Sequence, residues 1–353
     1  MTGTARWLRA ALLLVGAGLV VWAGYGAAGA GASLTGAVDL VAGLPWPQVA
    51  GLTVLWLAGL WVHTVVLAAS MPGLTHGRAL VLNLSGSAVS NVLPLGGVAG
   101  TALNLTMTRA WGHSNLDFAR FVVVSKAIDV IAKLVLPIVA VAWLLAAGVV
   151  TPAAAAAWWL PTAAGLAAGL LLAGALCGRS GPLLRLVGAV SRAIGRLPHQ
   201  RARGWGESWP SAVDKLLAGT DELVRRRRTA LILGMAGYWL AQGALLWCCL
   251  LAVGIRPHAA VVFGALAAER VATLLLITPG GAGPAEAGMV TTLIALGVDP
   301  TGSLAGVLLF RAFVFAAEIP VGAAATLGWW ANRRLRARTD RRRHLDGTPP
   351  ACA

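Results

Sequence analysis

The sequence predicts an all-α polytopic membrane protein with about six full transmembrane helices and two re-entrant or broken helical hairpins related as an inverted repeat. Its 353 residues are 58% hydrophobic and 12% charged, and the mean hydropathy is +0.77, which is far more apolar than an ordinary soluble domain. Apolar runs of about 20 residues, enough to cross roughly 30 Å of hydrocarbon, recur along the whole chain. Two matched interruptions rich in Pro and Gly account for the hairpins. The apolar runs do not alternate with polar residues, so a β-barrel is not expected.

The predicted full spans are apolar runs with few charges. They cover about residues 8–30, 46–70, 118–149, 157–177, 229–253 and 302–330. Arg6 and Arg9 precede the first run, so it could be a cleaved signal peptide or a retained anchor, and its length favours the anchor. The four cysteines, Cys177, Cys248, Cys249 and Cys352, have neither metal-like nor secreted-domain spacing.

The net charge of +15 is concentrated beside the predicted spans. Cations gather at Arg6 and Arg9, between residues 179 and 228, and in the tail between residues 333 and 343. By the positive-inside rule, the N-terminus, the central loop and the C-terminus are cytoplasmic, as expected for an even number of crossings of a bacterial inner membrane. This distribution is typical of topology signals that touch anionic lipid and argues against nucleic acid as a partner.

A basic linker divides the chain into a first membrane half, 1–177, and a second, 229–330. Within the linker, residues 178–228, apolar side chains recur at helical spacing from 183 to 197, as in a helix lying on a membrane surface. Pro198, Gly204 and Pro210 are expected to break the chain before a short helix over about 211–222. Residues 331–353 form a basic tail that we expect to be disordered.

The two halves contain similar sequences at a fixed offset of 185 residues. The first hairpin, about 79–112, and the second, about 259–297, each hold two stretches too short to span the membrane. The residues that interrupt them are Asn91, Pro94, Gly96 and Gly97 in the first, and Pro279, Gly280, Gly281 and Gly283 in the second. Three full crossings lie between the hairpins, so we expect them to enter from opposite faces, an arrangement that many secondary transporters use. The alternative is that these residues only permit close helix packing.

Ionisable side chains inside the predicted spans indicate a polar interior. Those that we expect to bind substrate are Lys126, Asp129, Arg270, Glu286, Arg311 and Glu318. Each charge costs roughly 2.5 to 3.5 kcal/mol at the centre of a spanning helix, so all should point into the bundle. The alternative is a structural network in which Lys126 pairs with Asp129, and Arg270 or Arg311 pairs with Glu286 or Glu318. His63, His76 and His113 are interpreted as incidental.

Two signatures resemble a known family. The run from Asn91 to Gly97, followed by residues 125–129, and the run 278–287, followed by 296–298 and 309–311, are similar to the lysylphosphatidylglycerol synthase transmembrane, or flippase-like, family. The resemblance concerns the membrane part only, without the aminoacyl-transferase domain of larger members. It implies a helical domain that moves, or helps to move, lipid-linked or amphipathic anionic cargo between leaflets. A Glu and an Arg usually follow the first Pro and Gly cluster in this family, whereas this chain has residues 98–102, Val-Ala-Gly-Thr-Ala.

Two classes of function follow. In a flippase, Lys126, Arg270 and Arg311 would bind a phosphate headgroup, while Asp129, Glu286 and Glu318 pair with them or carry protons. In the alternative, a non-transporting partner presents the Arg-rich loop to a lipid-synthesis or cell-envelope enzyme or to anionic lipid. No enzymatic motif, metal site or cofactor is expected. Gly280, Gly281 and Gly283 lie in a membrane break and do not follow a strand, as a nucleotide-binding glycine motif would.

Overall fold

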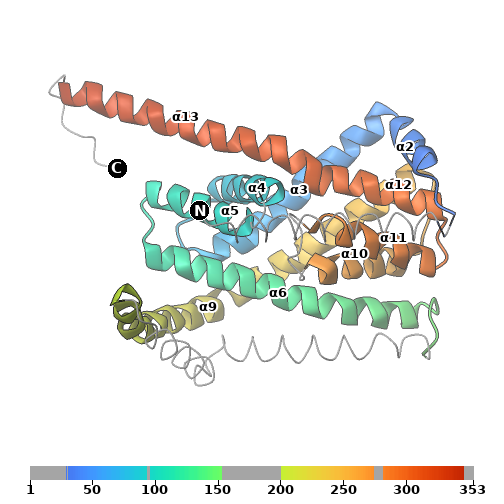
Figure 1. The fold of residues 1–353 in the computed structure, drawn as a ribbon, viewed down its shortest axis with the longest axis horizontal. Coiled ribbons are helices and arrows are strands. Elements are labelled where there is room, and N and C mark those ends of the chain that lie inside the picture. The colour runs from blue at the N-terminus through green and yellow to red at the C-terminus, as the bar shows by residue number, and fades with distance from the viewer. Residues whose placement is uncertain (1–28, 30, 94–95, 153–199, 274–280, 346–353) are drawn as a thin grey trace.

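The computed structural model describes residues 29, 31–93, 96–152, 200–273 and 281–345, with the backbone alone for 200–218 and 336–345. Every regular element in these ranges is helical (Figure 1), which confirms the predicted all-α class. The elements are α2 (Leu34–Ala42), α3 (Trp46–Ser70), α4 (His76–Val92), α5 (Gly96–Ala110), α6 (Asn115–Ala146), α9 (Gln200–Ala252), α10 (Ala259–Thr273), α11 (Pro284–Ala295), α12 (Pro300–Arg311), the π-helix η2 (Ala312–Ala317) and α13 (Glu318–Leu345).

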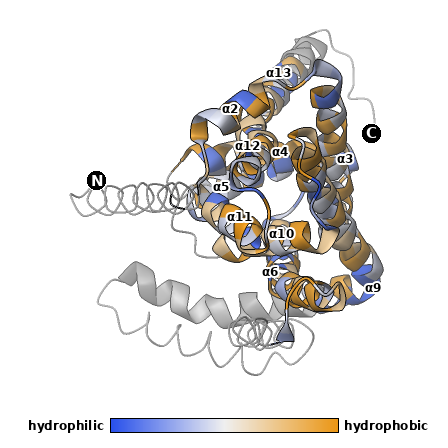
Figure 2. Ribbon diagram, turned by 90° about the vertical axis from the view of Figure 1, so that its right-hand side faces the viewer, coloured by the Kyte–Doolittle hydropathy of each residue, from blue (hydrophilic) through white to orange (hydrophobic). Residues whose placement is uncertain are grey.

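Within the residues that the structure describes, four stretches of helix are long and apolar enough to cross a membrane. They are Trp46–Ser70, Asn115–Ala146, Gly219–Ala252 and Pro300–Leu335, and each coincides with a predicted span. Figure 2 shows hydrophobic residues along most of the described helices. The other two predicted spans, 8–30 and 157–177, fall almost entirely outside the described residues, so the total of six stays a prediction.

Helix α9 continues without a break from Gln200 to Ala252. The interruption predicted at Gly204 and Pro210, with a separate short helix over 211–222, is therefore wrong. A proline removes one N–H donor and displaces one turn, but the hydrogen bonds of the flanking turns can carry a long helix past it. The arginines from Arg225 to Arg228 consequently lie on the same helix as the membrane span that follows them.

The two pairs of short helices lie toward opposite ends of the bundle (Figure 1). Helix α4 packs on α5 and α13, while α10 packs on α11 and α6, and α3 runs along α9. At the end of α6 nearest α10, the Trp143 and Phe263 ring centroids are 5.3 Å apart. At the other end, where α6 follows α5, Arg120 lies against Gly219 of α9. We call these the α10–α11 end and the α4–α5 end.

Landmarks of the two halves keep the 185-residue offset found in the sequence. Gly112 and Gly297 end the second short helix of each pair with φ of +90° and +85°, values that glycine adopts readily. The closing hydrogen bonds match as well, because His113 N donates to Thr108 O at 3.1 Å and Val298 N to Leu293 O at 3.0 Å. The next helix then begins at Asn115 in one half and at Pro300 in the other.

Polar N-caps fix where those next helices start. Ser114 accepts a hydrogen bond from Asp117 N, and the Asp117 side chain accepts one from Ser114 N, which completes a capping box. In the second half, Asp299 accepts from Gly302 N at 2.7 Å, and Pro300 occupies the first turn, where its missing N–H costs nothing. The start of the helix that follows each short pair is therefore fixed by capping residues at equivalent positions in the two halves.

Candidate functional site

In the described residues, no arm of either hairpin is long enough to cross the membrane. Helices α4 and α5 have 17 and 15 residues, and α10 and α11 have 15 and 12 in the described part. At 1.5 Å per residue, the longest spans about 25 Å, which is less than the hydrocarbon thickness of about 30 Å. Among the predicted break residues, Pro94, Pro279 and Gly280 lie outside the described residues.

The break between α10 and α11 contains backbone conformations that favour glycine. Gly281 and Gly283 have φ of +70° and +95°, a region that side chains with a Cβ rarely enter. Gly283 N donates to Glu286 Oε2 at 2.6 Å, so the carboxylate caps the first turn of α11, where the helix dipole favours negative charge. One acidic side chain thus orders the start of the second arm.

At the break between α4 and α5, the start of α5 packs closely on the backbone near the end of α4. A Cβ on Gly96 would lie 2.6 Å from the Cα of Ser90, whereas one on Gly97 would meet nothing within 4 Å. The packing alternative therefore holds for Gly96. Asn91, at the end of α4, donates from Nδ2 to the carbonyl oxygen of Phe315 at 3.4 Å, which ties the tip of this hairpin to the π-helix in the last span.

Charged residues from four helices meet in what we call the central charged cluster: Glu269, Arg270, Glu286, Arg311 and Glu318. Arg311 Nε lies 2.5 Å from Glu286 Oε1, and Arg311 Nη1 lies 3.8 Å from Glu269 Oε1. Arg270 Nε is 2.8 Å from Glu269 Oε2, although the two groups are not aligned as a hydrogen bond. These contacts join α10, α11 and α12.

Glu318 brings the first hairpin to the same cluster. Its carboxylate has Ser87 of α4 as a hydrogen-bond partner and lies within electrostatic reach of Arg270 and Arg311. Both Arg311 and Glu318 are buried, each with 7% of its surface exposed. The six-residue π-helix separates them, and such segments occur frequently at functional sites. This π-helix was not predicted from the sequence, because its residues, Ala-Phe-Val-Phe-Ala-Ala, do not differ from those of an ordinary apolar helix.

Helix α6 contributes a second group of charges. Asp129 Oδ2 lies 2.9 Å from Lys133 Nζ, so the suggested pairing of Asp129 with Lys126 is wrong. The i,i+4 spacing with the acid first is the more favourable geometry on a helix. Lys126 is exposed and makes no ion pair within the described part of the chain, so its direction relative to the bundle interior stays a prediction. Asp129 still lies within electrostatic reach of Lys126 and Arg270.

An uncharged polar array between α3 and α9 borders these charges. One of its members, His63, was interpreted from the sequence as incidental, and the other two were not predicted. The rings of His63 and Tyr238 stack with centroids 4.2 Å apart, and Gln242 Nε2 donates to Tyr238 Oη at 2.8 Å. Tyr238 lies within electrostatic reach of Arg270, Glu318 and Asp129. The four-residue spacing of Tyr238 and Gln242 in an apolar run was the available signal, because it places two polar groups on one helix face.

The profile described as "Lysylphosphatidylglycerol synthase TM region" matches residues 8–322. The chain belongs to this family. The match includes both hairpins and every residue of the central charged cluster. Among curated proteins, no relative matches the chain.

In this family member, the arginines of the cluster are held by carboxylates and by aromatic faces. Arg270 lies 5.3 Å from the ring centroid of Trp239, and Arg311 lies 4.9 Å from that of Phe315. Guanidinium groups bind carboxylate and phosphate oxygens in the same forked geometry. A phosphate could therefore replace a carboxylate partner without a new type of contact. Within the described residues, no set of three His, Cys, Asp or Glu side chains could hold a metal ion.

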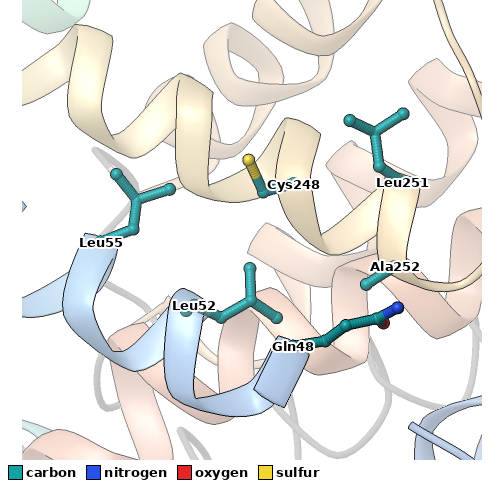
Figure 3. Close-up of a pocket in the computed structure, with 7 residues that line it drawn as sticks. Gln48, Leu52, Leu55, Cys248, Leu251 and Ala252 are labelled. Carbon is teal, nitrogen blue, oxygen red and sulfur yellow. The ribbon is translucent and has the colours of Figure 1, made fainter. Parts of the chain in front are cut away.

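A separate apolar groove of about 330 Å³ lies between α3 and α9 (Figure 3). Gln48, Leu52 and Leu55 line it on one side and Cys248, Leu251 and Ala252 on the other. Its lining contains no residue of the central charged cluster, so we do not assign the groove to the candidate site.

Proposed function

We propose that this multi-pass protein translocates, or helps to translocate, a lipid or lipid-linked anionic substrate between the leaflets of a bacterial inner membrane. The observation that supports this most is the central charged cluster. Buried arginines and carboxylates from the second hairpin and the last span meet there beside the tip of the first hairpin. Ionisable groups at this depth are costly, so they usually mark a substrate or proton pathway.

The proposed architecture is an inverted repeat with both termini in the cytoplasm. Two short-helix pairs at opposite ends of the bundle support it, as do helix starts that keep one offset of 185 residues. Inverted repeats with broken helices place a binding site near the midplane, where it can open to either side. Freed backbone groups at the breaks would line a hydrated cavity there rather than face lipid.

In the proposed cycle, the substrate phosphate first meets Lys126, the exposed cation, and then Arg270 and Arg311 inside the bundle. Glu269 and Glu286 hold the arginines when no phosphate is present. Exchange of a carboxylate for a phosphate keeps each guanidinium paired throughout, which avoids the cost of an isolated buried charge. Asp129 and Glu318 pair with the cations or carry protons.

A leaflet-specific assay tests the proposal. Proteoliposomes containing fluorescent anionic lipid would be assayed with the wild type, Lys126→Gln and Arg311→Lys. We expect the rate of lipid translocation to fall at least about tenfold in Arg311→Lys, which corresponds to about 1.4 kcal/mol. Lysine keeps the positive charge but lacks the forked geometry of the guanidinium group. Arg256→Gln, which changes an exposed arginine at the α10–α11 end, is the matched control and should behave as wild type.

A second candidate is a non-transporting partner of a lipid-synthesis or cell-envelope enzyme. The exposed arginines Arg225, Arg226, Arg227 and Arg228 favour it; Glu222 binds the first two of them. If the cluster variants fold and support function in cells like wild type while neutralising these four arginines abolishes that function, the partner function replaces the flippase.

A further inference from the structure

The array of His63, Tyr238 and Gln242 contains hydrogen-bonding atoms that the protein leaves unused. His63 Nδ1 and Gln242 Oε1 are shielded from solvent and have no hydrogen-bond partner, and Gln242 as a whole is buried with 6% exposure. The Asn83 side chain of α4 is the hydrogen-bond partner of the His63 ring. A buried polar atom without a partner costs about 1 to 3 kcal/mol, so two in one array need an explanation.

Charged groups approach His63 from two of the elements around it. Lys126 and Asp129 of α6 and Arg270 of α10 all lie within electrostatic reach of the imidazole. Helix α9 contributes the Tyr238 ring, and α4 contributes the uncharged Asn83. The π-helix η2, which also contacts α3, has no titratable side chain. The imidazole therefore faces two cations and one carboxylate, which is already 2.9 Å from Lys133.

This balance opposes a proton on His63 as long as the site holds no anion. A third positive charge would be repelled by Lys126 and Arg270, and Asp129 is shared with Lys133. An anion bound between Lys126 and Arg270 would offset their repulsion of the imidazolium, since a nearby opposite charge favours the charged form of a titratable group. Proton and anion would then each strengthen the binding of the other by the same factor.

We propose that His63 is a proton-binding site that is filled together with the anionic substrate, so that one proton accompanies each anion into the bundle. This inference rests on the anion site of the proposed function and adds the ion that is bound with it. Tyr238 and Gln242 position the ring, and Nδ1 is the atom that takes the proton. When one anion and one proton bind, neutral His63 becomes an imidazolium beside the anion. The two added charges are opposite, so the net charge of the site does not change.

Calorimetry on the full chain in detergent tests the linkage with dibutyl phosphate, a probe whose own charge does not change between about pH 6 and pH 8. Heats measured in buffers of different ionisation enthalpy give the number of protons taken up. We expect wild type to take up about one proton per bound anion, with a Kd that rises up to about tenfold per pH unit. His63→Gln should take up close to none and have a Kd independent of pH. His258→Gln, which changes an exposed histidine, should match wild type.

Ring-nitrogen NMR of the wild type provides a readout that does not depend on how well the variant folds. The His63 signal, assigned by its loss in His63→Gln, should move to the imidazolium position when dibutyl phosphate is added. The proposal is overturned if wild type does not bind the probe, if it takes up no proton, or if His63→Gln takes up the same number. Translocation without proton uptake would overturn only this linkage. Proton-linked binding without translocation would overturn only the flippase function.

Discussion

Arg311 is held by carboxylates from two helices of the second hairpin. Glu286 Oε1 lies 2.5 Å from its Nε, and Glu269 Oε1 lies 3.8 Å from Nη1. Glu286 also caps α11 through Gly283 N, so one carboxylate fixes both the start of a helix and the position of a buried guanidinium. Removal of one partner from a buried pair leaves an uncompensated charge, which costs more than the pair contributes.

At this scale we predict a strong energetic coupling between Arg311 and Glu286. Glu286→Gln keeps an acceptor for Gly283 N but loses the charge, and Glu286→Ala loses both, so thermal stability in detergent should fall in the order wild type, Gln, Ala. The double variant Glu286→Gln with Arg311→Gln should be more stable than the sum of the two single losses predicts, by about 1 to 3 kcal/mol. Additive losses in this cycle would contradict the pairing.

Individual site residues could be predicted from the sequence where a charged side chain stands in an apolar run. Arg311, Glu318, Arg270 and Glu286 were identified because each charge must be compensated. Glu269 was not among the residues expected to bind substrate, although it contacts both arginines. Partner choice was not predictable, because Asp129 can reach Lys126 or Lys133 from the same helix face and only packing decides between them.

At the scale of elements, glycines set how closely the first hairpin approaches its neighbours. A Cβ on Gly322 of α13 would collide with the carbonyl oxygen of Leu84 in α4, and one on Gly100 of α5 would lie 2.7 Å from the carbonyl oxygen of Gly86. Small residues that let backbones approach are the usual basis of helix association in membranes. The contact between α4 and α13 thus depends on the absence of a single methyl group.

Gly322→Ala should therefore destabilise the protein by about 1 to 3 kcal/mol, since the insertion of a methyl group into a packed contact forces backbone shifts. Gly328→Ala, on the same helix but with nothing within 4 Å of its Cβ, is the control. It should be neutral or stabilising by up to about 1 kcal/mol, because alanine has the higher helix propensity. Thermal unfolding in detergent measures both changes, and equal effects would rule out the close contact as the cause.

The elements themselves could be predicted to different extents. Hydropathy located the four described spans, since length and apolarity alone define them. The continuity of α9 through Pro210 could not be predicted, because local breaker signals do not report the hydrogen bonds that surround them. The π-helix also could not be predicted, since its apolar residues are equally compatible with an ordinary α-helix.

At the scale of the whole molecule, a group of exposed arginines, Arg225 to Arg228, lies at the α4–α5 end, whereas the exposed Arg256 lies at the other end. Arg225 to Arg228 follow Gly219, which lies against Arg120 near the start of α6. Trp329, four residues before Arg333, packs on the core cluster of Leu67, Met71 and Phe118 at the same end. Because arginines are retained on the cytoplasmic side, we expect this end to face the cytoplasm.

Cysteine labelling tests that orientation. In a background without native cysteines, Gly77→Cys at the start of α4 should react with an impermeant maleimide only from the cytoplasmic side. Arg256→Cys, between α9 and α10, should react only from the opposite side. Both positions are exposed, so a difference in labelling reports sidedness rather than burial. Labelling of both from one side would contradict the inverted arrangement.

The π-helix between Arg311 and Glu318 has a mechanical consequence. A π turn holds one residue more than an α turn, so conversion of this segment to α-helix would rotate α13 about its axis by roughly 100° relative to α12. Glu318 would leave the face it shares with Arg311, and the surface of α13 that packs on α4 would turn with it. A change of hydrogen-bond register over these six residues would therefore alter the contact between the last span and the first hairpin.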